Sequence, residues 1–199
     1  MSRRLIVGPI LSMDELQREA LPYEWIKSQT AFGAERRRRE WLSWRVHLRR
    51  ELARSPFCGV GAATLEIEYD ENGAPRIVGS DIYIGVTHTS HYVAVMLSTS
   101  KCGIDMESVG RNFGRVAHKY LSEVDQSYPL ALAIGWCTKE AAYKYGAITG
   151  VDFGRDIKIL GINYQTGEVT LKLLDTPLTA HFTHLEEEKH VIVVMSYEL

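Results

Sequence analysis

The sequence predicts an α+β protein made of two similar halves. Three observations support this: short segments rich in β-branched and aromatic residues, two long helical patterns, and an order of helices followed by strands that occurs twice. The 199 residues are 45% hydrophobic and 24% charged, which is typical of a globular protein and excludes disordered and fibrous chains. We expect domains at residues 1–100 and 101–199, fused into one compact body because no Pro/Gly-rich linker separates them.

Composition also limits the function classes. No segment approaches the roughly 18 unbroken apolar residues of a membrane helix, and a net charge of −2 does not favour nucleic acid, so neither partner is expected. The three cysteines, Cys58, Cys102 and Cys137, lack the spacing of paired ligands, which predicts reduced thiols in a cytoplasmic protein. We expect a monomer.

The first half begins with a strand in "MSRRLIVGPILSMDEL", for which a secretory signal is the alternative interpretation. Ser12 is then expected to cap a short helix, and an arginine-rich helix is expected over residues 34–54. Residues 64–78 predict a strand, a turn at Asn72-Gly73 and a returning strand. The apolar stretch 82–107, broken at 87–90 and 98–101, predicts two or three adjacent strands.

The second half repeats this order. Helices are expected over 112–126 and from Pro129 to Gly146 or Gly150. Four strands are expected to follow, at 157–164, 168–174, 180–185 and 190–197, with Thr166-Gly167 as a turn.

The helix at 34–54 carries a local concentration of positive charge. Its arginines include Arg36, Arg37, Arg38, Arg39, Arg45, Arg49 and Arg50. A solvated basic face is the plainer interpretation of such a run. Arg38 and Arg45 are seven residues apart, however, so they share a helix face and are able to bind one phosphate together.

Two carboxylates end the strand-like segment "GIDMES". In an extended chain Asp105 and Glu107 project to the same face, about 7 Å apart, and their like charges repel. A shared proton, a neighbouring Lys or Arg, solvation by water or a bound cation would offset this repulsion. Met106, between them, is expected to point to the opposite face.

A third carboxylate stands in the helical segment "WCTKEAAYK". Trp136, Glu140 and Lys144 recur every four residues and form one stripe, with Lys139 and Tyr143 on an adjacent row. An ordinary surface pair between Glu140 and Lys144 is one interpretation. Together with the two carboxylates of the strand, Glu140 instead completes an oxygen-rich site suited to Mg²⁺, with a lysine nearby for phosphate.

His88 lies at the break between two expected strands. A structural, hydrogen-bonding histidine is the plainer interpretation. The spacing from His88 to His91 resembles half of a zinc site, but no second Cys or His pair stands at a suitable distance, so zinc is not favoured.

The order of these segments resembles the 4′-phosphopantetheinyl transferase superfamily, in the longer class whose single chain holds two similar halves as a pseudo-dimer. The resemblance rests on the Gly and Pro at 73 and 75, Thr87-His88, "GIDMES" and "WCTKEAAYK", and covers residues 73–150 best. "GIDME" followed by "WCTKEAAYK" is specific only in combination.

The resemblance implies an enzyme that transfers the 4′-phosphopantetheine group of coenzyme A to a serine of an apo acyl or peptidyl carrier protein and releases 3′,5′-ADP. It implies Asp105, Glu107 and Glu140 as ligands of Mg²⁺, with Mn²⁺ as the alternative ion. Lys144 would contact the phosphates, and a carboxylate such as Glu140 would take the serine proton; which acid does so stays open. Such enzymes serve fatty-acid, polyketide or nonribosomal-peptide synthesis.

In the first half the resemblance implies that Thr87, His88 and Arg45 hold the 3′-phosphate of coenzyme A, and our own weaker suggestion adds Arg38. Two departures from the family pattern stand out. Ala74 replaces a common lysine, and Asp125, with Glu123 nearby, stands where a glutamate often follows the helix. A non-catalytic protein that binds coenzyme A or a nucleotide is therefore the alternative, and a plain α+β domain with solvated acids is a third.

Overall fold

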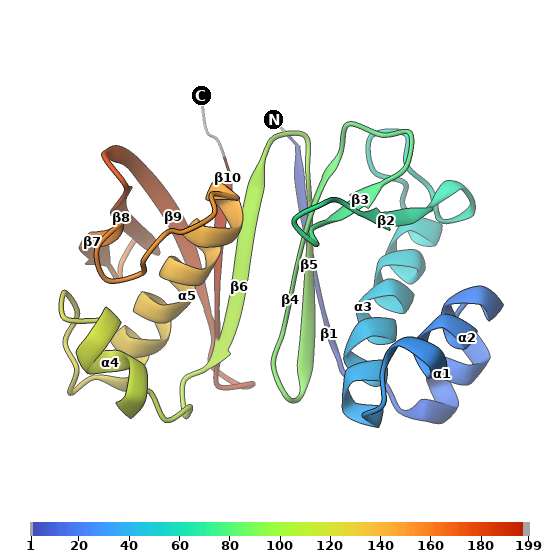
Figure 1. Ribbon diagram of the computed structural model, residues 1–199, viewed down its shortest axis with the longest axis horizontal. Helices are drawn as coiled ribbons and strands as arrows, with labels where there is room; N and C mark the ends of the chain where they lie inside the picture. The colour runs from blue at the N-terminus through green and yellow to red at the C-terminus, as the bar shows by residue number, and fades with distance from the viewer. Residues whose placement is uncertain (1, 197–199) are drawn as a thin grey trace. The chain divides into compact units, whose positions relative to one another are not determined.

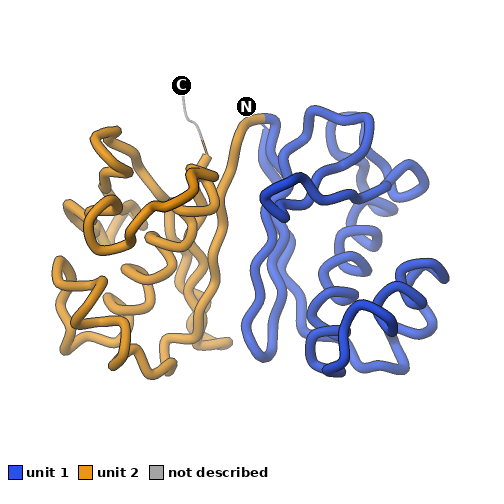
Figure 2. The backbone as a smooth tube through the Cα atoms, viewed as in Figure 1, with its two compact units in different colours: residues 1–99 blue, residues 100–199 orange. Residues whose placement is uncertain are grey.

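The computed structural model describes residues 2–196 and divides into two compact units, residues 1–99 and 100–199 (Figure 2). Each unit combines helices with one five-stranded antiparallel sheet. The predicted mixed α+β class is therefore confirmed. The two units are described separately below.

The first unit opens with a strand, continues with three helices and ends with four strands (Figure 1). Its elements are β1 (Arg3–Pro9), α1 (Met13–Glu19), α2 (Pro22–Ala31), α3 (Glu35–Arg54), a 3-10 turn η1 (Ala62–Thr64), β2 (Ile67–Tyr69), β3 (Pro75–Ile77), β4 (Tyr83–His88) and β5 (Tyr92–Ser98). The strand order is β1-β5-β4-β3-β2. The antiparallel pairing of β1 with β5 joins the first strand of the unit to its last.

Local sequence signals account for most of these elements. Ser12 caps α1, and the Glu15 carboxylate accepts a hydrogen bond from the Ser12 backbone N–H at 2.9 Å, completing a capping box. Between β2 and β3 the Asp70 carboxylate accepts from the Asn72 and Ala74 amides, each at 2.9 Å, and Gly73 takes φ of 78°. The sequence reading missed α2, which begins at Pro22 and has a weak apolar pattern.

The apolar core of the first unit lies between α3 and the sheet. Leu48 and Leu52 on α3 pack with Val93, Val95 and Leu97 on β5, and each is at most 1% exposed. Alternate residues of β5 face the helix, as strand geometry requires. Because this face of α3 packs on the sheet, the arginines of α3 lie on its other faces.

The second unit has the same kind of order (Figure 1). Its elements are β6 (Cys102–Ser108), α4 (Gly114–Tyr120), α5 (Pro129–Gly146), β7 (Ile157–Asn163), β8 (Glu168–Leu173), β9 (Thr176–Leu185) and β10 (His190–Ser196). The strand order is β6-β10-β9-β8-β7. All four predicted strands are present, and Tyr197, the predicted last residue of the fourth, lies outside the described residues.

The C-terminal ends of α4 and α5 can be compared with the predicted ends. α4 ends at Tyr120, well before the predicted residue 126, and a turn follows in which the Asp125 carboxylate accepts from the Ser127 amide at 2.9 Å. α5 ends at Gly146, the first of the two predicted ends, and Ala147 takes the left-handed conformation at its C-terminus.

The two sheets share one strand order. In each, the first strand pairs with the last, and the remaining strands follow in reverse sequence order. A long helix, α3 or α5, lies between the first strand and the later four in sequence and packs on the sheet of its own unit (Figure 1). The two halves therefore repeat one topology.

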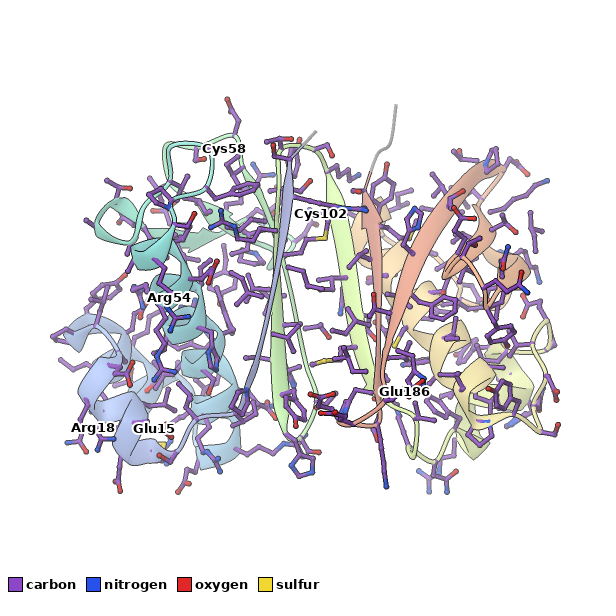
Figure 3. The ribbon with its side chains drawn as sticks, turned by 180° about the vertical axis from the view of Figure 1, so that it is seen from behind. Glu15, Arg18, Arg54, Cys58, Cys102 and Glu186 are labelled. Carbon is purple, nitrogen blue, oxygen red and sulfur yellow. The ribbon has the colours of Figure 1, made fainter. Side chains whose placement is uncertain are left out.

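The described residues contain no helix that is long and apolar enough to cross a membrane. Cys58, Cys102 and Cys137 are all free thiols, with Cys58 exposed in the loop after α3 and Cys102 at the start of β6 (Figure 3). Burial raises the pKa of the Cys102 thiol to about 12, which keeps this thiol protonated.

The turn before β7 provides a test of the fold by pH. Arg155 donates two hydrogen bonds to the Asp156 carboxylate, at 2.7 and 2.8 Å, and holds its pKa at about 2, below the ordinary 3.8. A lowered pKa stabilises the folded state above pH 3.8, and this contribution is lost as the pH falls toward 2. We expect Asp156→Asn to lower the denaturation midpoint at neutral pH, with no difference from wild type near pH 2. Asp175→Asn, in an exposed turn, is the control; an unchanged midpoint for Asp156→Asn at neutral pH would contradict the assignment.

Candidate functional site

Asp105 and Glu107 project from β6 toward α5. In the antiparallel pairing with β10, Asp105 lies opposite Val193 and Glu107 opposite Val191. Both valines belong to the apolar core that packs against α5, so the two carboxylates share the helix-covered face of the sheet. Met106 lies opposite Ile192 and points to the other face, as expected from the alternation.

Gly103 lets α5 approach this strand closely. A Cβ atom at this position would lie 2.1 Å from the Ala141 carbonyl oxygen and 2.8 Å from the Tyr145 backbone nitrogen. No side chain fits at such distances from backbone atoms. The glycine two residues before Asp105 therefore sets the spacing between the strand and the helix that carries Glu140 and Lys144.

Lys144 neutralises Asp105. Its Nζ lies 2.7 Å from Asp105 Oδ1 and 3.1 Å from the Ile104 carbonyl oxygen, while Asp105 itself is only 6% exposed. The buried Cys137 thiol donates to the Val191 carbonyl oxygen at 3.9 Å, and burial together with the nearby charge of Asp105 raises the pKa of that thiol well above its usual range. Asp105 is thus paired with the ammonium group of Lys144 and lies near a neutral thiol.

Glu107 has a different counter-charge. Arg111, in the loop after β6, forms an ion pair with the Glu107 carboxylate. The Arg111 guanidinium also lies 5.4 Å from the ring centroids of Phe113 and Trp136, within the range of a cation–π contact. The repulsion between the two acids is therefore offset by one lysine and one arginine.

Glu140 stands next to this pair on α5. Burial raises the pKa of its carboxyl, and the negative charge of Asp105 raises it further. Lys144 and Arg111 act in the opposite direction without cancelling the shift. The pKa of the Glu140 carboxyl therefore lies above its ordinary value of 4.5, so this group binds a proton more readily than an unperturbed glutamate does.

The carboxylates have the donor chemistry of a Mg²⁺ site, because Mg²⁺ prefers hard oxygen ligands. Within residues 2–196, however, no three His, Cys, Asp or Glu side chains lie together in a group that could hold a metal ion as they stand. Asp105 and Glu107 instead bind Lys144 and Arg111. A cation would have to displace one or both basic side chains, and the oxygen donors fit such an ion once that happens.

The first unit holds the residues that the resemblance assigned to coenzyme A. Arg45 is 1% exposed, and its guanidinium lies 3.5 Å from the Trp41 ring centroid and 4.1 Å from that of Trp44. It donates to the Tyr69 hydroxyl at 2.7 Å and lies 3.4 Å from the Glu24 carboxylate. Burial lowers the pKa of Arg45. Arg45 is thus a packed, paired side chain in this conformation.

Arg38 and Arg45 have different partners. Arg38 donates to the Gln29 side-chain oxygen at 2.5 Å, whereas Arg45 lies near the Glu24 carboxylate. Arg49 lies near the same Glu24 carboxylate, at 2.5 Å. Side chains of α2 therefore cover part of the arginine row of α3, and the prediction of a plain solvated face does not describe Arg45 or Arg49.

Thr87 and His88 end β4. Thr87 is 5% exposed, and His88 is partly exposed with its Nε2 3.7 Å from the buried Glu40 carboxylate. Arg36 and Arg37 also bind Glu40, at 2.7 and 3.1 Å. This places His88 beside the basic N-terminal turn of α3.

The two units differ at matching strand positions. β1 and β6 are both seven residues long and both pair with the last strand of their sheet. Where β6 has Asp105 and Glu107, β1 has Ile6 and Gly8, and the His47 ring fills the space that a Gly8 side chain would need. The carboxylate pair thus occurs in only one of the two matching strands.

Sequence reasoning missed several residues of these clusters, among them Gly103, Arg111, Cys137 and Glu24. The glycine at the start of "GIDMES" carried a usable signal, since a glycine inside a strand often marks a close backbone approach. The others carried none, because their roles depend on which chain segments meet in the fold.

The spacing at Gly103 yields a prediction. Gly103→Ala should destabilise the protein by about 1–3 kcal/mol, because the new methyl group must push α5 away from β6. Chemical denaturation measures this. Gly110→Ala is the matched control, since a Cβ there would meet only the Ser108 hydroxyl at 3.7 Å, and equal effects of the two substitutions would refute the close approach.

Glu140 yields a second prediction. Because its pKa is raised above the ordinary 4.5, the folded state loses stability as the pH rises above that value. Without divalent cations, Glu140→Gln should therefore raise the melting temperature at neutral pH, and the gain should shrink as the pH falls toward 4.5 and be absent below it. A lower melting temperature for the variant at neutral pH would show that the Glu140 charge is stabilising.

Models of known protein families and curated proteins were both searched, and neither search gives a match to this chain. The functional assignment therefore rests on the residues and their geometry.

Proposed function

We propose that this protein is a Mg²⁺-dependent 4′-phosphopantetheinyl transferase that modifies a serine of an apo acyl or peptidyl carrier protein. One observation carries the proposal: two carboxylates of β6 face the helix that supplies a third carboxylate and a lysine. This is the set of side chains that the motif pair "GIDME" and "WCTKEAAYK" implies for that chemistry.

The reaction requires charge neutralisation. The serine oxygen forms a new bond to the phosphorus next to the pantetheine arm, the bond from that phosphorus to the bridging oxygen breaks, and 3′,5′-ADP leaves. The carboxylates of Asp105, Glu107 and Glu140 would hold the Mg²⁺ ion. When bound, Mg²⁺, or Mn²⁺ in its place, supplies positive charge that screens the pyrophosphate from the incoming oxygen.

Glu140 is the best candidate for the base that takes the serine proton. Asp105 is already paired with Lys144 and Glu107 with Arg111, whereas burial and the Asp105 charge raise the pKa of Glu140, which favours proton acceptance by this carboxylate. The sequence alone left this choice open among the acids, and the surroundings of the three carboxylates now favour Glu140.

Lys144 would change partners during the reaction. In the absence of ligand its ammonium group binds Asp105, from which a cation would release it. Its side chain is about one third exposed, so the ammonium is within reach of solvent and of a bound phosphate. It would then stabilise the charge that develops on the leaving phosphate.

Coenzyme A binding by the first unit is part of the same proposal. Thr87 and His88, at the end of β4, would contact the 3′-phosphate together with Arg45 and Arg38. For the two arginines this role requires release from Glu24 and Gln29. The repeated topology of the two halves supports the two-half pseudo-dimer fold that the family resemblance implies.

A non-catalytic protein that binds coenzyme A or a nucleotide is the alternative function. It is favoured by Ala74, whose hydrogen bonds with Asp70 use only its backbone N–H and carbonyl groups, and by the basic side chains that already neutralise Asp105 and Glu107. A monomeric, cytoplasmic enzyme of fatty-acid, polyketide or peptide synthesis remains our expectation for the leading function.

Mass spectrometry of a purified apo carrier protein tests the proposal. With coenzyme A and Mg²⁺ the carrier should gain the mass of one phosphopantetheine group. Asp105→Ala should abolish the gain while the circular dichroism spectrum stays unchanged, and Asp175→Ala, an exposed acid between β8 and β9, should not affect it. No gain across several carrier proteins, with retained binding of coenzyme A, would favour the non-catalytic alternative.

A further inference from the structure

We propose that Lys139 is a positioning residue that fixes the rotation of α5 and thereby holds Glu140 and Lys144 against Asp105. The kinetic part of this inference rests on the proposed function, whereas the structural part does not. Lys139 lies beside Glu140 in the sequence, yet it points about 100° away around the helix, toward the other side of the unit.

Lys139 is a fully buried lysine with three acceptors. Its side chain is 0% exposed, and Nζ lies 2.7 Å from the Ile157 carbonyl oxygen, 2.8 Å from that of Phe153 and 3.1 Å from Glu123 Oε1. An ammonium group has three N–H donors, so this arrangement uses all of them. The three acceptors come from the α4–α5 connection, the loop before β7 and β7 itself.

The acceptors are themselves held in place. The Asp152 carboxylate accepts from the Gly154 and Arg155 amides at 2.9 and 2.8 Å, which shapes the loop that presents the Phe153 carbonyl. The Phe153 ring packs against α5, with its centroid 5.6 Å from that of Trp136 and 5.5 Å from that of Tyr143. Lys139 therefore binds a loop that is itself held by hydrogen bonds and by ring contacts with α5.

Burying the charge of Lys139 costs desolvation free energy. Desolvation lowers the pKa of Lys139, and only one of its three acceptors carries a charge. An apolar side chain of similar length would often be as stable in such a place. An apolar side chain, however, does not form the three directional hydrogen bonds of Lys139. These bonds restrict both the rotation of α5 about its axis and its sliding along that axis.

α5 is thus located from two sides. On the β6 side the Gly103 contact sets how close the helix lies, but backbone contact alone permits rotation and sliding. On the other side the three bonds of Lys139 remove that freedom. Glu140 and Lys144 lie one and five residues further along the same rigid helix, so their positions relative to Asp105 follow from the anchor.

A double-mutant cycle tests the structural part. Asp105→Asn, Lys144→Met and the pair are made in wild type and in Lys139→Met, and the coupling in unfolding free energy is measured in both. We expect the Asp105–Lys144 coupling of wild type to be lost in the Lys139→Met background. If Lys139 merely stabilises the fold, Lys139→Met will lower every unfolding free energy and leave the Asp105–Lys144 coupling unchanged. That result would overturn the inference.

A second variant covers failure of Lys139→Met to fold. Glu123→Gln keeps a neutral acceptor for the lysine, and it should reduce the same coupling without abolishing it. Lys172→Met, which removes an exposed lysine of β8, is the matched control and should leave the coupling as in wild type. Unchanged coupling in Glu123→Gln, when Lys139→Met does not fold, would count against the anchor.

The transfer reaction provides a separate readout. Lys139→Met should raise the Mg²⁺ concentration for half-maximal transfer by about tenfold or more, as is usual for residues that orient metal ligands, with the KM for the carrier unchanged. An unchanged Mg²⁺ requirement would overturn the positioning role. If wild type transfers nothing, the proposed function fails, and the coupling measurement alone decides the inference.

Discussion

The close approach of α5 to β6 at Gly103 is the constraint on which the chemistry of the second unit depends. Without a side chain at that position, helix backbone and strand backbone meet directly. Asp105, two residues along the strand, therefore comes within hydrogen-bonding distance of Lys144 on the helix. A wider spacing would let water separate the two groups and weaken both the ion pair and the burial of Glu140. The packing of α5 on β6 thus determines the strength of the Asp105–Lys144 ion pair.

The resulting site is a balanced set of charges. Asp105 with Lys144 and Glu107 with Arg111 form two pairs, and Glu140 is left as a carboxylate whose burial opposes its ionisation. The three carboxylates carry the hard oxygen atoms that a divalent cation prefers, and two of them have a basic side chain as counter-charge in the structure. The first unit repeats the topology without the carboxylates, so the duplicated fold supports different side-chain chemistry in its two halves.

Much of this could be predicted from the sequence. Strand alternation places Asp105 and Glu107 on one face, and helical spacing places Glu140 and Lys144 on one stripe; both patterns are local and hold in the structure. The partners of these residues could not be predicted, because they depend on contacts between distant segments. A surface pair between Glu140 and Lys144 was one interpretation of the sequence, whereas the structure pairs Lys144 with Asp105. Likewise, nothing local indicated that Glu24 of α2, a helix with a weak apolar pattern, would bind the arginines of α3.

The central claim is that these carboxylates bind a divalent cation together with the pyrophosphate of coenzyme A. Electron paramagnetic resonance of Mn²⁺, titrated into the protein in the presence of coenzyme A, tests it most directly. The account predicts one bound ion per chain, displaced by Mg²⁺ and lost in Asp105→Ala. Absence of a bound ion in the wild-type protein, or binding that Asp105→Ala leaves unchanged, would contradict it.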